Sequence, residues 1–170
     1  KRLDWPAPHP LYFDDELLKT HRKGIDIEQI QQAVNLLNEQ GVEWNGYALL
    51  GGLDISREEA RNVAVQSGKF MIDNNAYKVS VNGVFVTDRI NKGFAERIYV
   101  PDYQDLIFVL NQLCAYREAR SSKTLFKVGF EEEDTKNVVR FPYASSVEEI
   151  KGISDKLREF NLSQNPKCLV

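Results

Sequence analysis

Residues 77–87, YKVSVNGVFVT, carry the strongest β-strand signal in the chain. Apolar and polar residues alternate on both sides of Asn82-Gly83, as they do in a strand with one buried face. Asn-Gly is also the preferred pair for a two-residue type I′ hairpin turn, because both positions need positive φ. The pattern therefore predicts an antiparallel hairpin in which Val81 pairs with Val84.

The helices are predicted from their caps and from apolar residues at helical spacing. Asp26 and Gln29 form a capping box before a helix at 27–40, and Ser56 and Glu59 form another before a helix that runs to about residue 72. Further helices are predicted at 14–22, from 102 to about 120 and from 146 onward, and further strands at 94–100, 125–130 and 138–143.

These elements come in blocks rather than in strict alternation, which favours an α+β fold. We expect a largely antiparallel sheet built from hairpins at 77–87 and about 125–143, packed with three to four amphipathic helices. The predicted organisation is an extended Trp/Pro-rich arm at 1–13, a single globular domain at 14–161 and a flexible tail at 162–170. Prolines at every second position of the arm exclude a helix or an inner strand there.

Composition places the chain among ordinary globular proteins. It has 170 residues and a net charge of −3, so there is no global attraction to nucleic acid or anionic lipid. No apolar run approaches the ~20 residues of a transmembrane helix. The two cysteines are too few for a disulfide framework, which predicts an intracellular protein, cytoplasmic or nuclear, with free thiols.

Gly51-Gly52 stand between an apolar run and a helix start, the order in which proteins bind phosphate. A P-loop needs a longer glycine-rich loop that ends in Lys and Ser or Thr, and a dinucleotide fingerprint needs three spaced glycines. Ser56 and Glu59 are expected to use the free N–H groups of the helix, and Asp54 would repel a phosphate. The stretch is therefore interpreted as turn and cap chemistry.

Catalytic and metal-binding patterns are not found. The two histidines, His9 and His21, lie near the N-terminus without a fixed partner, and Cys114 falls in the apolar stripe of a predicted helix. The acidic run at 131–134 lacks the spacing and glycine of a calcium loop. No cofactor or metal is predicted, and the enzymatic alternative is a small hydrolase or nuclease that uses His9 or His21 with a carboxylate.

The preferred interpretation is a non-enzymatic protein-interaction or regulatory module within a larger protein or assembly. The predicted contacts with a protein partner are Trp5, Pro8 and Tyr12 in the arm, together with Phe85, an aromatic residue on the polar face of the predicted hairpin.

The alternative interpretation is a nucleic-acid-binding domain with a local basic patch. Its candidate residues are Arg89, Lys92, Arg97, Arg117, Arg120 and Lys123. The last three are expected near the C-terminus of one helix, where cations also stabilise the helix dipole.

Overall fold

The computed structural model describes residues 14–20, 22–84, 86, 92–131, 139–140 and 147–170. The helices are α1 (Asp15–Thr20), α2 (Ile27–Glu39), α3 (Arg57–Asp73), α4 (Lys92–Ala95), α5 (Tyr103–Ala119), α6 (Val147–Ser163) and the 3₁₀ helix η2 (Pro166–Leu169). The strands are β1 (Asn45–Leu50), β2 (Gly52–Leu53), β3 (Lys78–Gly83), β4 (Ile98–Tyr99), β5 (Leu125–Val128), β6 (Phe130–Glu131) and β7 (Val139–Arg140).

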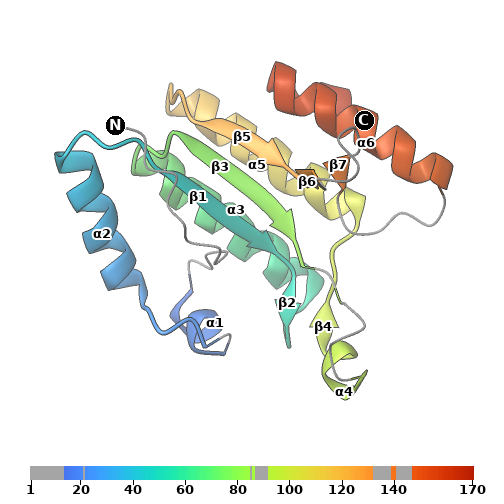
Figure 1. Cartoon of the computed structure of the whole chain (residues 1–170), viewed down its shortest axis with the longest axis horizontal. Coiled ribbons are helices and arrows are strands. Elements are labelled where there is room, and N and C mark those ends of the chain that lie inside the picture. Colours follow the sequence, from blue (N-terminus) through green and yellow to red (C-terminus); the bar gives the residue numbers. More distant parts are fainter. Residues whose placement is uncertain (1–13, 21, 85, 87–91, 132–138, 141–146) are drawn as a thin grey trace.

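A parallel sheet in the order β1-β3-β5 forms the centre of the fold. The helices α3 and α5 connect its strands, which gives the alternation of a Rossmann-like α/β unit. Each crossover moves one strand along in the same direction, so both helices pack on the same face of the sheet. Figure 1 shows β1, β3 and β5 in front of α3 and α5.

The core lies between the sheet and these two helices. Alternate side chains of each strand are at most 2% exposed there, and they include Ala48, Val79, Val81 and Phe126. The helices approach closely at Gly68, where a Cβ atom would lie 2.5 Å from Leu113 of α5. On the opposite face of the sheet the side chains are more polar and partly exposed, namely Tyr47, Leu49, Lys78, Asn82, Leu125 and Lys127.

The predicted α+β fold with its hairpin at 77–87 is wrong. Asn82 and Gly83 lie within β3 and pair with Leu49 and Leu50 of parallel strand β1, so they do not form a turn. Period-two alternation of apolar and polar residues predicts a pleated strand with two different faces, but it does not indicate whether the neighbouring strand is parallel or antiparallel. The Asn-Gly pair therefore continues strand β3, and the predicted type I′ turn is not formed.

The second predicted hairpin, at about 125–143, is only partly correct. Its first strand, β5, pairs parallel with β3, and only β6 and β7 form a short antiparallel pair. The strand predicted at 94–100 is shorter than expected. Residues 92–95 form α4 instead, and β4 pairs antiparallel with β2.

The helix predictions from capping boxes are confirmed for α2 and α3, where Asp26 with Gln29 and Ser56 with Glu59 make both reciprocal hydrogen bonds. The first two residues of the predicted tail, 162 and 163, belong to α6. Leu169, which follows α6, is fully buried. In the part of the chain that the structure describes, no helix combines the length and apolar character needed to cross a bilayer.

Candidate interaction surface

The glycine turn after β1 packs against the protein's own chain. Gly51 has a φ of +98°, and a Cβ atom there would lie 2.6 Å from the carbonyl oxygen of Tyr99 and 2.9 Å from Cδ of Pro101. The Ser56 hydroxyl accepts the Glu59 amide at the start of α3. This geometry requires glycine for close packing of two chain segments, and it supports the turn-and-cap interpretation.

A buried carboxylate joins the N-terminal ends of α3 and α5. The Asp105 side chain is 0% exposed, and its Oδ1 accepts Nε of Arg57 at 2.7 Å and Nε of Arg61 at 2.6 Å. Its Oδ2 accepts the Tyr99 hydroxyl at 2.5 Å and the Asp102 amide at 2.9 Å. Arg57 also pairs with the Asp102 carboxylate.

These charges balance one another. Burial alone would raise the pKa of Asp105, but the hydrogen bonds from Tyr99, the Asp102 amide and the two arginines outweigh it and lower the pKa. The pKa of the Tyr99 hydroxyl is raised by burial and by its hydrogen bond to Asp105. Because two arginines face two aspartates, the cluster offers no net charge to a ligand, and we interpret it as the polar link between the two helices.

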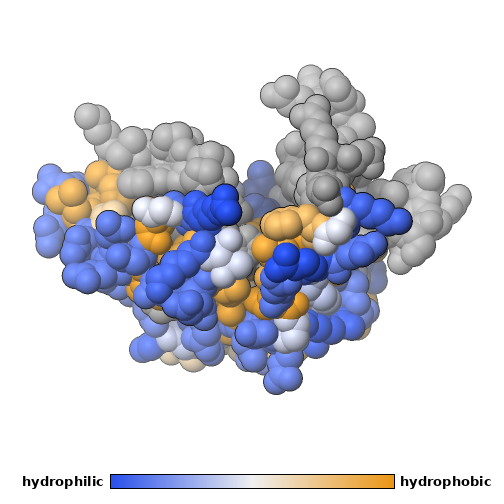
Figure 2. Space-filling model, turned by 90° about the horizontal axis from the view of Figure 1, so that it is seen from below, coloured by the Kyte–Doolittle hydropathy of each residue, from blue (hydrophilic) through white to orange (hydrophobic). Residues whose placement is uncertain are grey.

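A cleft of about 960 Å³ lies between β4, the first turns of α5, the helix α6 and the C-terminal residues. Its apolar lining includes Ile98, Val100, Ile107 and Ile153, and Lys156 adds a cation. Figure 2 looks at the molecule from the side of the carboxyl ends of the parallel strands and shows apolar areas divided by polar residues. Because Asp102 and the polar groups of Tyr99, Tyr103 and Gln104 also line the cleft, its lining does not favour one class of ligand.

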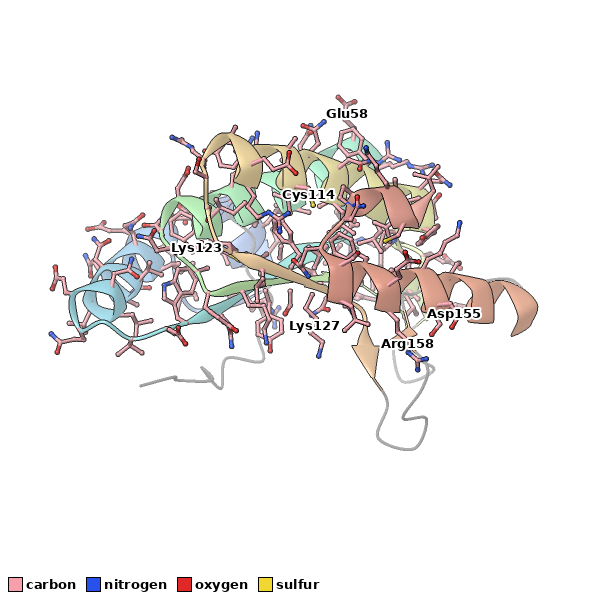
Figure 3. The ribbon with its side chains drawn as sticks, turned by 90° about the horizontal axis from the view of Figure 1, so that it is seen from above. Glu58, Cys114, Lys123, Lys127, Asp155 and Arg158 are labelled. Atoms are coloured by element: carbon pink, nitrogen blue, oxygen red, sulfur yellow. The ribbon has the colours of Figure 1, made fainter. Side chains whose placement is uncertain are left out.

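The described residues of the predicted basic patch lie at opposite ends of α5. Lys92 and Arg97 lie before the helix, at the carboxyl edge of the sheet, whereas Arg117 and Arg120 lie in and after its last turn. A helix of 17 residues is about 25 Å long at 1.5 Å per residue. Lys123 follows the same end of α5 and is exposed (Figure 3).

The three described arginines of this set, out of four, make contacts within the chain. Arg97 pairs with Asp54, and Arg120 pairs with Asp73. Arg117 stacks over the Phe126 ring at 5.1 Å. The described members therefore do not form one continuous basic surface.

The other predicted site residues lie outside the described residues: Trp5, Pro8, Tyr12, His9, His21, Phe85 and Arg89. Cys114 is buried, and burial raises its pKa to about 11, as expected for a core thiol. Among the described side chains, no group of three or more His, Cys, Asp or Glu residues is arranged to hold a metal ion.

The outer edge of β5 is closed by side chains of α6. Asn161 accepts the Val128 amide at 2.9 Å and donates to the Val128 carbonyl at 3.1 Å. Gln164 accepts the Phe126 amide at 2.6 Å and donates to the Phe126 carbonyl at 2.8 Å. Two side-chain amides thus take the place of a further strand on this edge.

Gln164 is held in this position by an unusual backbone conformation. Its φ is +57°, in the left-handed region that is costly for a residue with a side chain. Arg117 donates to both its side-chain oxygen and its carbonyl oxygen, at 3.4 and 3.3 Å. Neither interaction was expected from the sequence, because residues 162–170 were assigned to a flexible tail.

The outer edge of β1 is different. The carbonyls of Trp44 and Leu50 accept hydrogen bonds from Tyr77 and Val84, on the β3 side. Main-chain groups of successive residues in a strand point to opposite edges, so those of Tyr47 and Leu49 point away from β3. No residue in the described ranges hydrogen-bonds these outward groups.

The fold is an α/β domain in which side chains of α6 close one sheet edge, and no described residue pairs with the outward main-chain groups of Tyr47 and Leu49 on the other. No protein-family model matches the chain, and neither a curated protein nor a solved structure matches it.

Proposed function

We propose that this protein is a non-enzymatic interaction module that binds an extended segment of a partner protein along β1. The observation that carries the proposal is the difference between the two sheet edges. Asn161 and Gln164 make four hydrogen bonds to the edge of β5, whereas Tyr47 and Leu49 keep outward N–H and C=O groups. An exposed edge of this kind is the recognition surface in strand addition.

The side chains around this edge suit such a partner. Tyr47 and Leu49 are partly exposed on the open face of the sheet, next to the main-chain groups that would pair. Main-chain hydrogen bonds would supply affinity, and contacts with these two side chains would supply specificity. The charges at the carboxyl edge are paired with one another, so that region offers no comparable recognition chemistry.

The experiment is a capture assay from native lysate with two matched variants. Tyr47→Pro removes the outward N–H group and leaves the β1–β3 ladder intact, because that N–H group does not pair with β3. Tyr47→Ala removes the same side chain but keeps the N–H group. We expect Tyr47→Ala to retain most of the captured protein and Tyr47→Pro to lose it.

Equal capture by both variants would contradict strand addition at β1. Nuclease treatment of the lysate separates the alternative function, because recovery that depends on nucleic acid would favour a nucleic-acid-binding domain. We further propose that the protein acts inside the cell, which is supported by its two free cysteines, Cys114 and Cys168.

A further inference from the structure

The open face of the parallel sheet, opposite α3 and α5, carries positive charge. The register of the strands arranges its side chains in rows that run across the sheet. One row holds Tyr47 of β1, Ser80 of β3 and Lys127 of β5, and Lys78 of β3 belongs to the next row. Tyr47, Lys78 and Lys127 are partly exposed. On this face β1, β3 and β5 present two lysines and no carboxylate, in a chain whose net charge is −3.

These cations are not neutralised by described residues. Within the described ranges, neither Lys78 nor Lys127 forms an ion pair, and Arg158 of α6 forms none either, although Asp155 lies one turn away on the same helix. Figure 3 shows Lys127 and Arg158 on the side of the molecule opposite Glu58 of α3. By contrast, four arginines elsewhere pair with carboxylates, namely Arg57, Arg61, Arg97 and Arg120. The open face therefore has positive charge available to a ligand.

The cations follow one another across the strands. Neighbouring strands are about 4.8 Å apart, so Tyr47 and Lys127 are separated by about 10 Å. The small Ser80 between them is 5% exposed, so its two longer neighbours form the outer surface of this row. Asn161, one turn after Arg158, bonds both main-chain groups of β5 at Val128, which places Arg158 beside the same edge.

A peptide strand added to β1 could not use these cations. It would run along β1, and Lys127 lies three strand spacings, about 14 Å, from such a strand. A ligand that contacts Tyr47, Lys127 and Arg158 together must instead lie across the open face. The side chains of this face thus suit a second ligand, which is held by side chains and not by main-chain pairing.

We infer that the open face binds a short stretch of single-stranded nucleic acid, with a base stacked on Tyr47 and phosphates bound by Lys78, Lys127 and Arg158. Aromatic side chains combined with cations are the common means of binding single strands, because every base can stack and every nucleotide carries a phosphate. An acidic peptide would satisfy the cations, but its carboxylates would not stack on the Tyr47 ring. This function is separate from strand addition at β1.

Fluorescence anisotropy of the whole chain with a labelled oligothymidylate of about ten nucleotides tests the inference. Lys92, exposed on α4 at the carboxyl edge of the sheet (Figure 1), provides the matched control. A lysine that binds a phosphate contributes about 0.7 to the slope of log affinity against log salt concentration. We expect Lys78→Gln and Lys127→Gln each to reduce the slope by about 0.7 and Lys92→Gln to leave it unchanged.

Tyr47 supplies a second readout, which concerns stacking and not charge. Tyr47→Ala should weaken binding of the oligothymidylate about tenfold, because the base loses its stacking surface. Tyr47→Phe keeps the ring and should bind like the wild type. Both variants keep the outward N–H group of β1, so they do not disturb strand addition.

Three results would overturn the inference. The first is no binding of the oligothymidylate at low salt. The second is an equal loss of slope in Lys127→Gln and Lys92→Gln, which would attribute binding to general charge. The third is displacement by oligoglutamate as effective as by unlabelled oligothymidylate, which would indicate a site for an acidic peptide. None of these results concerns the main-chain groups of β1, so protein capture by Tyr47→Pro and Tyr47→Ala still tests the proposed function independently.

Discussion

Replacing Gln164 by alanine tests whether α6 closes the β5 edge with its side-chain amides. The substitution removes two hydrogen bonds to Phe126, of 2.6 and 2.8 Å. A satisfied hydrogen bond contributes about 1 kcal/mol net, and a buried group left without a partner costs about 1–3 kcal/mol. We therefore expect Gln164→Ala to lower the free energy of unfolding by about 2–3 kcal/mol.

Gln164→Gly provides the matched comparison. It loses the same two hydrogen bonds, but glycine accepts the φ of +57° without the ~1 kcal/mol cost that a Cβ atom adds. The glycine variant should therefore be about 1 kcal/mol more stable than the alanine variant. Gln112→Ala, on the exposed side of α5, should stay within about 0.5 kcal/mol of the wild type.

Urea unfolding followed by circular dichroism measures these differences. In a chain of this size, 2–3 kcal/mol corresponds to a fall in Tm of about 4–12 °C. Hydrogen exchange adds a local readout, since the Phe126 amide should exchange faster in both variants while the amides that pair with β3 keep their protection. The reasoning would be refuted if Gln164→Ala were as stable as Gln112→Ala.

Three further predictions follow from the buried groups. Gly51→Ala should lower the free energy of unfolding by about 2–4 kcal/mol, because it adds a left-handed side chain and a clash with the Tyr99 carbonyl, and thermal unfolding will measure it. The folded-state pKa of Asp105 is below its ordinary value of 3.8, so its stabilisation is complete above that pH and is lost as pH falls through the lower, folded-state value. At neutral pH the free energy of unfolding of Asp105→Asn should be about 3 kcal/mol lower than that of the wild type. In an acid titration below about pH 4, the free energy of unfolding should then fall less steeply in the variant than in the wild type. Cys114, with a pKa of about 11, should react with a thiol reagent at neutral pH only after unfolding; modification at the rate of an exposed thiol in the native chain would contradict its burial.

The local elements of this fold are readable from the sequence because their signals are local. Ser56 with Glu59 and Asp26 with Gln29 mark helix starts through contacts three residues apart, and the structure has both. The alternation of β3 is equally local, and it corresponds to one face of the strand, with Val79 and Val81, that is buried in the core.

The sheet topology could not be obtained from the same signals. Whether Asn82-Gly83 forms a turn or continues a strand depends on pairing with Leu49 and Leu50, more than thirty residues away. A long helix between two strands is the signature of a parallel crossover, and α3 and α5 both have this placement. That signal was present in the sequence, but the Asn-Gly pair favoured an antiparallel hairpin, and the predicted topology followed the Asn-Gly pair.

The candidate interaction surface could not be predicted from the sequence for a different reason. Tyr47 and Leu49 matter through their main-chain groups, which every residue has, so no motif marks them. Asn161 and Gln164 act on the backbone of β5, and only the packed position of α6 brings them there. Both edges become visible only once the strand order is known.

The most direct test of the account is hydrogen exchange at four outward-facing amides, with and without the captured partner. These are Tyr47 and Leu49 on β1 and Phe126 and Val128 on β5. We predict that the partner slows exchange at Tyr47 and Leu49 and leaves Phe126 and Val128 unchanged. Partner-induced protection at the β5 amides, or none at the β1 amides, would contradict strand addition at β1.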